Sequence, residues 1–339
     1  MLHDHTFAPP RFLAGCIAIA TAALISANAV AEPVKIGLQK LAGQGYVYLA
    51  KEKGYFAAES IDAEFVFFPQ PDTIPLAIVS GDLDFGGFGL TATLYNLAGQ
   101  GALRIIAPGI GDAPGFMLFA AIASNQASAA GLKSYKDLPG HSFAATTVGS
   151  ATVYTLTLIA AKYGFNLQSV RVLALQSPAN ILSAISGGQA DSSIIGATLA
   201  MPTIQNAGVK LIGYTGDEVP WQAGGWYAAT QTTNERRQLV EHFVHALSKG
   251  RRDYAAAFIG QDGKPKDGAT TPEVLATIAK YVGQSVDQVK LSISYIDPDG
   301  RMNVRDVLHQ IDWYRSQGMV KGDFDPASII DKRYVVPLP

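Results

Sequence analysis

The sequence has little cysteine, no excess of basic residues and only one long apolar run. Its single cysteine, Cys16, lies in that run near the N-terminus. The rest of the chain therefore offers neither an internal disulfide nor a thiol nucleophile. The 26 Lys and Arg residues against 28 Asp and Glu residues give a formal net charge of −2. Nucleic-acid-binding surfaces are normally basic, so this balance argues against nucleic acid as a partner.

The long apolar run, FLAGCIAIATAALISANAVA, has the pattern of a secretory signal peptide. A basic residue precedes it, and residues 29–31 form an A-x-A cleavage motif. We therefore expect residues 1–31 to be a signal peptide, cleaved after Ala31, and the protein to be exported to the periplasm. A retained membrane anchor is the alternative, but the apolar run over 12–27 is short for a bilayer. Lipidation at Cys16 also stays open, although most of the apolar run follows this cysteine.

From Pro33 onward, short apolar segments alternate with longer amphipathic ones. Segments such as PVKIGLQ, DAEFVFF and LDFGGF predict strands, whereas GYVYLAKEKGYF and LTATLYNLAGQG predict helices. After a polar break, SNQASAAGLKSYKDLPG, the alternation starts again, and beyond residue 231 the chain is mostly helical. Strands that alternate with helices in this way favour an α/β fold with parallel sheets.

One phrase occurs in both halves of the alternating region. When AIVSGDLDFGGFG and AISGGQADSSIIG are aligned on Gly81 and Gly188, Asp84 coincides with Asp191. A glycine that ends a helix is common in any α/β protein, but it does not explain the coinciding aspartates. The repeat therefore predicts two similar lobes. We expect both aspartates to be structural, because a short Asp just after a helix usually bonds backbone amides.

The chain is expected to cross between the lobes twice, near residues 121–130 and 216–226. Lobe 1 would then be discontinuous, comprising residues 32–124 and 223–339. Lobe 2, residues 125–222, would be inserted into it as a block.

Five phrases along the chain resemble a known family when taken in order. They are VKIGLQKLAGQGYVYLAKEKGYFAAESIDAEFVFF, AIVSGDLDFGGFG, SYKDLPGHSFAATTVGSATVYTLTLIAAKYG, AISGGQAD and DPDGRMNVRDVLHQIDWYRSQGMV. They resemble the periplasmic solute-binding proteins of ABC importers, in the nitrate, sulfonate, taurine and thiamine-precursor (NMT1/THI5-like) branch. The resemblance implies a two-lobe periplasmic-binding-protein fold of type II, with a hinge and a ligand cleft. It also implies the transmembrane subunits of an ABC importer as partners; we expect a monomer.

The candidate ligand-binding residues of lobe 1 follow the predicted strands, where open α/β sheets bind ligands. Lys40 is the only basic residue near a predicted strand end, which makes it the leading counter-ion for an anion; a solvated surface lysine is the alternative. Glycines around residue 89 would let the backbone approach a ligand closely, or simply allow tight packing. The lobe 1 candidates are Gln39, Lys40, Tyr46, Phe88, Gly89 and Thr91.

In lobe 2 the strongest local signal is TTVGSAT, residues 146–152. Backbone N–H groups and the hydroxyls of Ser150 and Thr152 would form an anion site at a helix N-terminus; plain N-capping by Ser150 is the simpler reading. Trp226, on the returning strand, is either an aromatic face of the cleft or a core residue. The candidates of lobe 2 and this strand are Gly149, Ser150, Thr152, Tyr154, Gln176, Ser177, Ala197, Thr198 and Trp226.

Motifs that would indicate an enzyme or a metal site are weak. His242 and His245 lie three residues apart on a charged helix, with no evident third ligand. Ser142 in GHSFA opens a strand instead of sitting on a strand-to-helix turn. We therefore expect no catalytic residues, no metal and no cofactor. The alternatives are an enzyme like the pyrimidine-synthesis enzymes of this fold, whose Cys-rich motif this chain lacks, and a ligand-loaded partner of a sensor receptor.

The residue types at the predicted cleft favour a small mono-anion with an apolar or aromatic body. One lysine, one helix N-terminus and several hydroxyls suit a sulfonate or a carboxylate, whereas a di- or trivalent anion would call for two or more cations. A neutral heteroaromatic, such as a pyrimidine precursor of thiamine, is the alternative ligand.

Overall fold

The computed structural model describes residues 1–3 and 31–339, and residues 31–339 form one compact unit. The expected signal peptide, with Cys16, falls on residues 4–30 for the most part and so lies outside the described residues. In the part of the chain that is described, no helix combines the length and the apolar character needed to cross a membrane.

The first of two five-stranded sheets is built from both ends of the compact unit. Strand β12 runs antiparallel to both of its neighbours, β3 and β4, while β1 pairs in parallel with β2 and β3. In spatial order the strands are β2 (Ile61–Phe67), β1 (Glu32–Leu38), β3 (Phe85–Gly87), β12 (Gly225–Ala229) and β4 (Leu103–Pro108).

The second sheet repeats this arrangement with the intervening part of the chain. Here β6 runs antiparallel to β9 and β10, while β7 pairs in parallel with β8 and β9. In the matching order the strands are β8 (Arg171–Ala174), β7 (Ser142–Ala145), β9 (Ser192–Gly196), β6 (Phe119–Ala123) and β10 (Lys210–Tyr214). Each sheet is thus parallel except for one strand, the one that enters it from the other sheet, which corrects the expectation of purely parallel sheets. We call the parts built on the two sheets the first and the second lobe.

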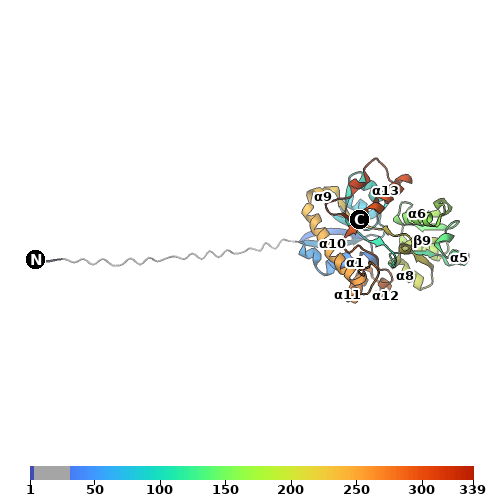
Figure 1. Ribbon diagram of the computed structural model, residues 1–339, viewed down its shortest axis with the longest axis horizontal. Coiled ribbons are helices and arrows are strands. Elements are labelled where there is room, and N and C mark those ends of the chain that lie inside the picture. The colour runs from blue at the N-terminus through green and yellow to red at the C-terminus, as the bar shows by residue number, and fades with distance from the viewer. Residues whose placement is uncertain (4–30) are drawn as a thin grey trace. The chain divides into compact units, whose positions relative to one another are not determined.

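The helices divide between the two lobes as the sheets do (Figure 1). The first lobe carries α1 (Gly45–Glu52), α2 (Tyr55–Ala58), α3 (Thr73–Val79) and α4 (Ala92–Gly99). The second carries α5 (Asn125–Ala129), α6 (Ala151–Tyr163), α7 (Pro178–Ser186) and α8 (Ala197–Gln205). The C-terminal helices are α9 (Thr230–Glu235), α10 (Arg237–Phe258), α11 (Thr271–Val282), α12 (Val286–Lys290) and α13 (Val304–Ser316).

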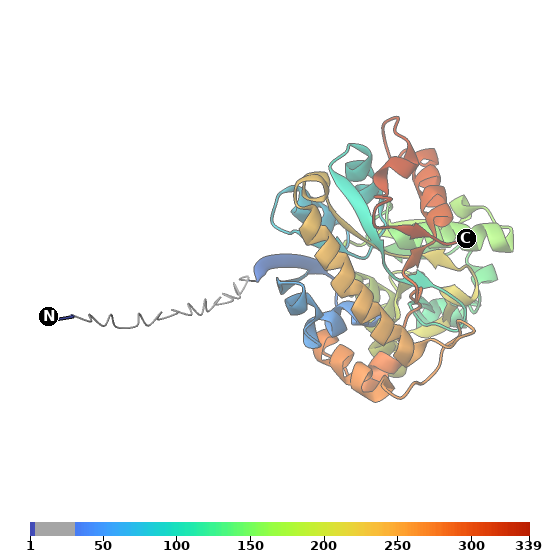
Figure 2. The same cartoon turned by 60° about the vertical axis from the view of Figure 1, so that its left-hand side comes forward.

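The long helix α10, gold in Figure 2, lies against α1 in the first lobe. A glycine allows this close approach, because a Cβ on Gly250 would lie 2.1 Å from the Tyr46 carbonyl oxygen. Two short strands near the C-terminus, β13 (Arg301–Met302) and β14 (Val336–Pro337), pair in parallel. The C-terminal third of the chain therefore completes the first lobe.

The two repeated aspartates occupy the same position in the two lobes. Asp84 Oδ2 accepts a hydrogen bond from the Lys35 N–H of β1 (2.9 Å), and Asp191 Oδ2 accepts one from the Ser142 N–H of β7 (2.8 Å). Each carboxylate therefore ties the start of the third strand in its lobe to a backbone N–H of the first strand. The prediction that both aspartates are structural is confirmed.

Two short segments, residues 109–118 and 215–224, join the sheets and form the hinge. They pair with each other through the antiparallel strands β5 (Gly111–Asp112) and β11 (Trp221–Gln222). The first crossing thus lies earlier in the chain than the expected one near residues 121–130. Strand β6, which we expected in lobe 1, therefore pairs in the second sheet. The apolar run GFMLFAAIA continues from hinge to strand without a break, which hides this boundary in the sequence. The predicted lobe limits otherwise stay a prediction.

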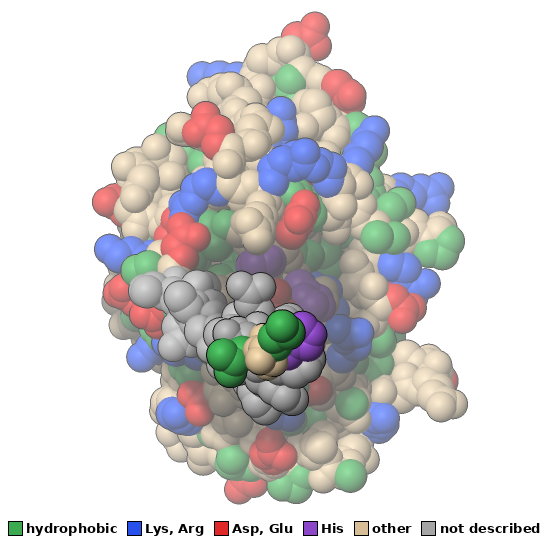
Figure 3. Space-filling model, turned by 90° about the vertical axis from the view of Figure 1, so that its left-hand side faces the viewer, with side chains coloured by type: hydrophobic (Ala, Val, Ile, Leu, Met, Phe, Trp, Pro, Cys, Tyr) green, Lys and Arg blue, Asp and Glu red, His purple; other side chains and the backbone are tan. Residues whose placement is uncertain are grey.

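Basic and acidic side chains are interspersed over the face shown in Figure 3. Among the described residues, several charged side chains form ion pairs, as in the Lys53–Asp253 pair (3.0 Å) and the Lys249–Glu59 pair (2.9 Å). This face therefore carries no extended field of one sign.

Candidate functional site

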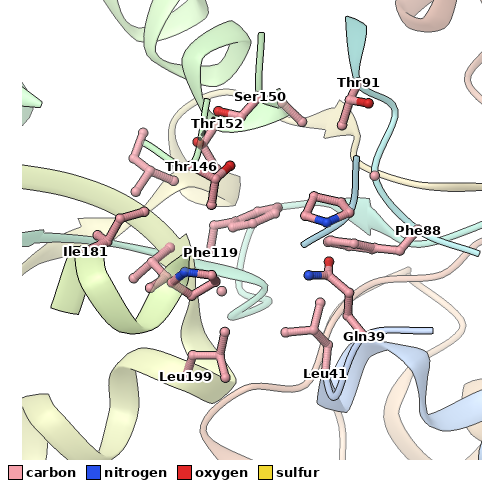
Figure 4. A pocket seen from close by; sticks show the side chains of 17 residues that line it. Gln39, Leu41, Phe88, Thr91, Phe119, Thr146, Ser150, Thr152, Ile181 and Leu199 are labelled. Carbon is pink, nitrogen blue, oxygen red and sulfur yellow. Dashed lines mark hydrogen bonds between the residues drawn. The ribbon is translucent and has the colours of Figure 1, made fainter. Parts of the chain in front are cut away.

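A small cavity lies between the two lobes, with residues of the first lobe facing residues of the second (Figure 4). Its volume is about 70 Å³. A single water needs roughly 10–15 Å³ of such a cavity, so the space suits a few waters or part of a small ligand. It is lined by Gln39, Leu41, Pro71, Phe88, Gly89, Thr91, Phe119, Thr146, Ser150, Ala151, Thr152, Pro178, Ile181, Ile194, Ile195, Gly196 and Leu199.

Three pairs of these lining residues hold equivalent positions in the two lobes. The members of each pair lie at or just after the carboxyl end of the same strand of the repeat. The sequence offset between them equals the offset between Asp84 and Asp191. The pairs are Gln39 with Thr146, Pro71 with Pro178, and Gly89 with Gly196. The cavity is therefore built from the carboxyl ends of three strands in each sheet, which is where α/β sheets place their ligands.

Hydroxyl groups supply much of the polar lining. Thr91 caps α4, its side chain accepting from the Leu94 N–H at 3.4 Å. Ser150 stands at the N-cap position of α6, but its hydroxyl does not cap the helix and lies 3.0 Å from Thr152 Oγ1 instead. Plain N-capping by Ser150 is therefore wrong. The first turn of α6 is left without a capping side chain on the cavity side.

Four helices begin at this cavity: α4, α6, α7 and α8. The N-terminal end of a helix carries a partial positive charge, and its free N–H groups bind anions. None of the lining residues is Lys, Arg, Asp or Glu. The lining thus combines helix N-termini and hydroxyl groups without a formal charge, although α4 and α7 are capped by Thr91 and Ser177.

A second cavity, of about 460 Å³, adjoins the first. The two share Gln39, Leu41, Pro178 and Leu199 in their linings. The outer cavity adds Lys40 and the neighbouring Phe67, whose ring centroid lies 5.4 Å from Lys40 Nζ. The only charged side chain in the two linings is therefore at the outer end.

The structure brings together about half of the residues predicted to bind ligand. The inner cavity holds Gln39, Phe88, Gly89, Thr91, Ser150 and Thr152. The outer one holds Gln39 again, with Lys40 and Ser177. Neither lining includes Tyr46, Gly149, Tyr154, Gln176, Ala197, Thr198 or Trp226.

Tyr46 and Trp226 lie in the core of the first lobe instead of facing the cavity. Trp226 is fully buried, and its Nε1–H donates to the Tyr46 hydroxyl at 2.6 Å. Burial raises the pKa of Tyr46 to about 12. The expected aromatic face is supplied by Phe88 and Phe119, which line the cavity with ring centroids 6.3 Å apart. Phe88 adopts a φ of +94°, a region that favours glycine and is often occupied at ligand sites.

Several other predicted residues join the lobes or pack inside the second one. Thr198 Oγ1 accepts from the Ala42 N–H (3.1 Å), and the Gly149 carbonyl accepts from the Ala92 N–H (3.3 Å). Ala197 is buried in the smaller hydrophobic cluster of the second lobe. Gln176 has a left-handed φ of +71° in the turn before α7.

The lining residues that sequence reasoning missed fall into two groups. Thr146 and Gly196 were detectable, because the internal repeat aligns them with the predicted residues Gln39 and Gly89. The apolar residues Phe119, Ile181 and Ile194 carry no such signal, since their pattern is that of ordinary core residues.

The described residues hold no group of three or more His, Cys, Asp and Glu side chains placed to bind a metal ion. His245 Nδ1 lies 2.8 Å from Glu59 Oε1, and His242 Nδ1 lies 3.0 Å from the Glu59 carbonyl oxygen. Both histidines thus contact the same glutamate.

Comparisons with known proteins agree with this geometry. The family model described as NMT1/THI5 like matches residues 44–257. Comparison with curated protein sequences finds no match. Among solved structures, the alkanesulfonate-binding protein of Xanthomonas axonopodis pv. citri, bound to MOPS, is 19% identical, with a TM-score of 0.68, 88% of this chain covered and 98% of that one.

Two further structures are similar over most of their length. The periplasmic aliphatic sulphonate binding protein of Escherichia coli is 18% identical, with a TM-score of 0.68, 91% of this chain covered and 94% of that one. The periplasmic nitrate-binding protein of Synechocystis PCC 6803 is 12% identical, with a TM-score of 0.67 and coverages of 88% and 84%. The chain has the periplasmic-binding-protein fold, and since the family model spans more than half of it, the chain belongs to the NMT1/THI5-like family.

Proposed function

We propose that this protein is an extracytoplasmic solute-binding protein that captures a small organic mono-anion between its lobes and delivers it to an ABC permease. The observation that carries the proposal is the inner cavity, where hydroxyls and four helix N-termini from both lobes surround an uncharged space. The structural neighbours include periplasmic proteins whose names state that they bind sulfonate or nitrate. We further propose export to the periplasm, with cleavage after Ala31, and a monomeric state.

The inner cavity suits a mono-anionic head group. A sulfonate or carboxylate can accept hydrogen bonds from Ser150, Thr152 and Thr146, while the N-terminus of α6 offsets its charge. In a space shielded from water these dipoles act more strongly than at an exposed surface. A multiply charged anion would require cations that this lining lacks.

The apolar part of the lining suits a ligand with an apolar or aromatic body. Phe88 and Phe119 offer ring surfaces, and Leu41 and Leu199 continue from the inner cavity into the outer one. A body in contact with these side chains would gain roughly 25 cal/mol per Å² of apolar surface removed from water. Nitrate offers no such surface and would leave these contacts unused.

A neutral heteroaromatic, such as a pyrimidine precursor of thiamine, is the second candidate. The observation that favours it is the uncharged inner lining, in which the Gln39 amide and the hydroxyls could bond ring nitrogens and an amino group. With either ligand, we propose a binding protein without enzymatic activity. A role as the ligand-loaded partner of a sensor receptor would use the same site, and reconstituted transport with the permease would separate that role from import.

A thermal-shift screen of residues 32–339 tests the proposal. The compounds are taurine, alkane and aromatic sulfonates, benzoate-type acids, nitrate and hydroxymethylpyrimidine. A ligand that binds only the folded protein raises the melting temperature by mass action. We expect the largest rise with an organic sulfonate or carboxylate.

Two variants separate the inner cavity from its surroundings. Ser150→Ala should reduce the shift, because it removes a hydroxyl from the inner lining. Ser285→Ala is the matched control, since Ser285 caps α12 through the Gln288 N–H and lines neither cavity. A shift with hydroxymethylpyrimidine alone would replace the anion by the neutral ligand.

A further inference from the structure

Tyr154 connects the two lobes beside the ligand cavity. It lies in the first turn of α6, the helix whose starting residues Ser150 and Thr152 line the inner cavity. Its hydroxyl donates to Asp306 Oδ1 at 2.8 Å and lies 2.9 Å from His309 Nδ1. Asp306 and His309 belong to α13, so this contact joins the second lobe to the C-terminal helix of the first.

The acceptor on α13 is held in place by its own lobe and by the hinge. Asp306 Oδ2 accepts from the Gln222 N–H of β11 and from Gln310 Nε2, both at 2.8 Å. The Asp306 N–H donates to Asn303 Oδ1 at 3.1 Å. The carboxylate therefore keeps its orientation without Tyr154 and offers Oδ1 to a partner from the other lobe.

The ring of Tyr154 is enclosed on both sides of the lobe boundary. The side chain is fully buried, with its ring centroid 5.8 Å from that of Trp221 in the hinge and 5.6 Å from that of Trp313 on α13. A buried tyrosine hydroxyl needs a hydrogen-bond partner, and here the partner is available only while the lobes are together. When the lobes separate, water can solvate both groups.

We propose that Tyr154 is a positioning residue, whose hydrogen bond to Asp306 stabilises the closed arrangement of the lobes and holds the start of α6 against bound ligand. The inference rests on the proposed ligand-binding function. Helix α13 would then help to retain bound ligand, although its residues line neither cavity.

The bond should act on ligand release more than on ligand capture. An interaction present only in the closed state slows opening and shifts the equilibrium towards closed. Most affinity differences among variants of one site arise in the dissociation rate. Because a hydrogen bond to a charged group is among the stronger ones, Tyr154→Phe should speed dissociation about tenfold.

The test measures the distance between the lobes with and without a defined probe, benzenesulfonate. Residues 31–339 contain no cysteine, so spin labels at Glu64→Cys and Gln168→Cys report one distance across the lobes by double electron–electron resonance. Tyr154→Phe keeps the ring and removes only the hydroxyl. Without the probe, we expect longer distances between the lobes in the Tyr154→Phe variant than in the wild-type protein. With the probe, we expect benzenesulfonate to dissociate faster from the variant.

The matched control is Tyr254→Phe, which removes a buried hydroxyl that bonds the Ser294 carbonyl oxygen at 3.0 Å within the first lobe. It should lower the melting temperature but leave the distance distribution and the dissociation rate unchanged.

Three results would overturn the inference. They are a Tyr154→Phe distance distribution equal to that of the wild-type protein, a wild-type protein with no closed population under either condition, and equal changes in the control. Failure of benzenesulfonate to bind the wild-type protein would count against the proposed ligand class, whereas the distances without the probe would still decide the role of Tyr154.

Discussion

The two lobes share a scaffold but present different side chains to the cavity. Their sheets have the same strand order, and Asp84 and Asp191 make the same bond to the first strand. At the cavity, the first lobe contributes Gln39, Leu41, Phe88 and Thr91, whereas the second contributes three hydroxyls, Phe119 and a larger set of aliphatic side chains. The repeated aspartates maintain the fold, and under the proposed function the side chains that differ at the cavity would select the ligand.

The third strand of each sheet shows how this difference arises. In β3, Gly87 leaves room for the Trp226 ring, whose atoms would lie 2.7 Å from a Cβ at that position. The equivalent residue of β9 is Ile194, which lines the cavity. The first lobe therefore uses this position for packing, while the second uses it to line the cavity.

The largest effect is expected at the hinge, which belongs to neither copy of the repeat. Asp112 is buried there between the crossing segments, and burial raises its pKa from 3.8 to about 7 despite hydrogen bonds from Thr215 and Trp221. Because the pKa of Asp112 is higher in the folded protein than in the unfolded chain, protonation of Asp112 stabilises the folded state. This contribution to the free energy of unfolding is fully present below pH 3.8 and is lost as the pH rises to about 7. The loss amounts to about 4 kcal/mol.

The comparison of Asp112→Asn with the wild-type protein isolates this contribution. Relative to the wild type, the free energy of unfolding of the variant should rise by about 4 kcal/mol between pH 4 and pH 8, because the amide does not titrate. Urea denaturation at each pH measures it. A difference that stays constant with pH would contradict the prediction.

The second largest effect is expected from Gly87→Ala in β3. The added methyl group meets the Trp226 ring, which is fully buried and hydrogen-bonded to Tyr46 and so has little freedom to move. Overpacking of this kind should lower the free energy of unfolding by about 3 kcal/mol. Gly111→Ala is the control, since its nearest contact would be an ordinary 3.4 Å. Equal melting temperatures for the two variants would argue against a packing role for Gly87.

A smaller and equal effect is expected when either repeated aspartate is removed. Asp84→Ala loses the bond from Lys35 and one from Arg236 Nη1 (2.8 Å); Asp191→Ala loses bonds from the Ser142 N–H and hydroxyl. Each should cost about 1.5 kcal/mol in chemical denaturation. Asp82→Ala is the exposed control. If only one of the two variants lost stability, the prediction that the two aspartates stabilise their lobes equally would be wrong.

The Asp191 pair also has a predictable pH dependence. Although burial opposes ionisation, the bonds from the Ser142 N–H and hydroxyl lower the pKa of Asp191 below its ordinary value. The stability it supplies is therefore present above that ordinary value and is lost as the pH falls through the lowered one. The free energy of unfolding of Asp191→Ala should therefore approach that of the wild-type protein as the pH falls. Relative to the wild type, Asp191→Ala thus loses stability as the pH rises, whereas Asp112→Asn gains it.

The sequence was sufficient to predict the two-lobe scaffold and most of the polar residues that line the inner cavity. Gln39, Ser150 and Thr152 follow strands or begin helices, so their place at the cavity depends on local pattern and on the general rule for α/β sheets. Trp226 and Phe119 depend instead on which distant strands pair, because each lies on a strand that enters one sheet from the other. The strands that contain them, GWYAA and FAAIA, are continuous apolar runs, and such runs look the same whether a residue faces a core or a cleft.

The smallest effect is expected at Lys40, the one charged side chain of the two linings. Its ammonium lies over the Phe67 ring in the outer cavity, where solvent screens it. Lys40→Met keeps the apolar stem and removes the charge, so benzenesulfonate affinity should fall about threefold at low salt and by much less at high salt. Calorimetric titration at two salt concentrations measures this. A tenfold or larger loss that persists at high salt would mean that the anion is held at the outer end by Lys40, and that the helix N-termini of the inner cavity are not its main counter-charge.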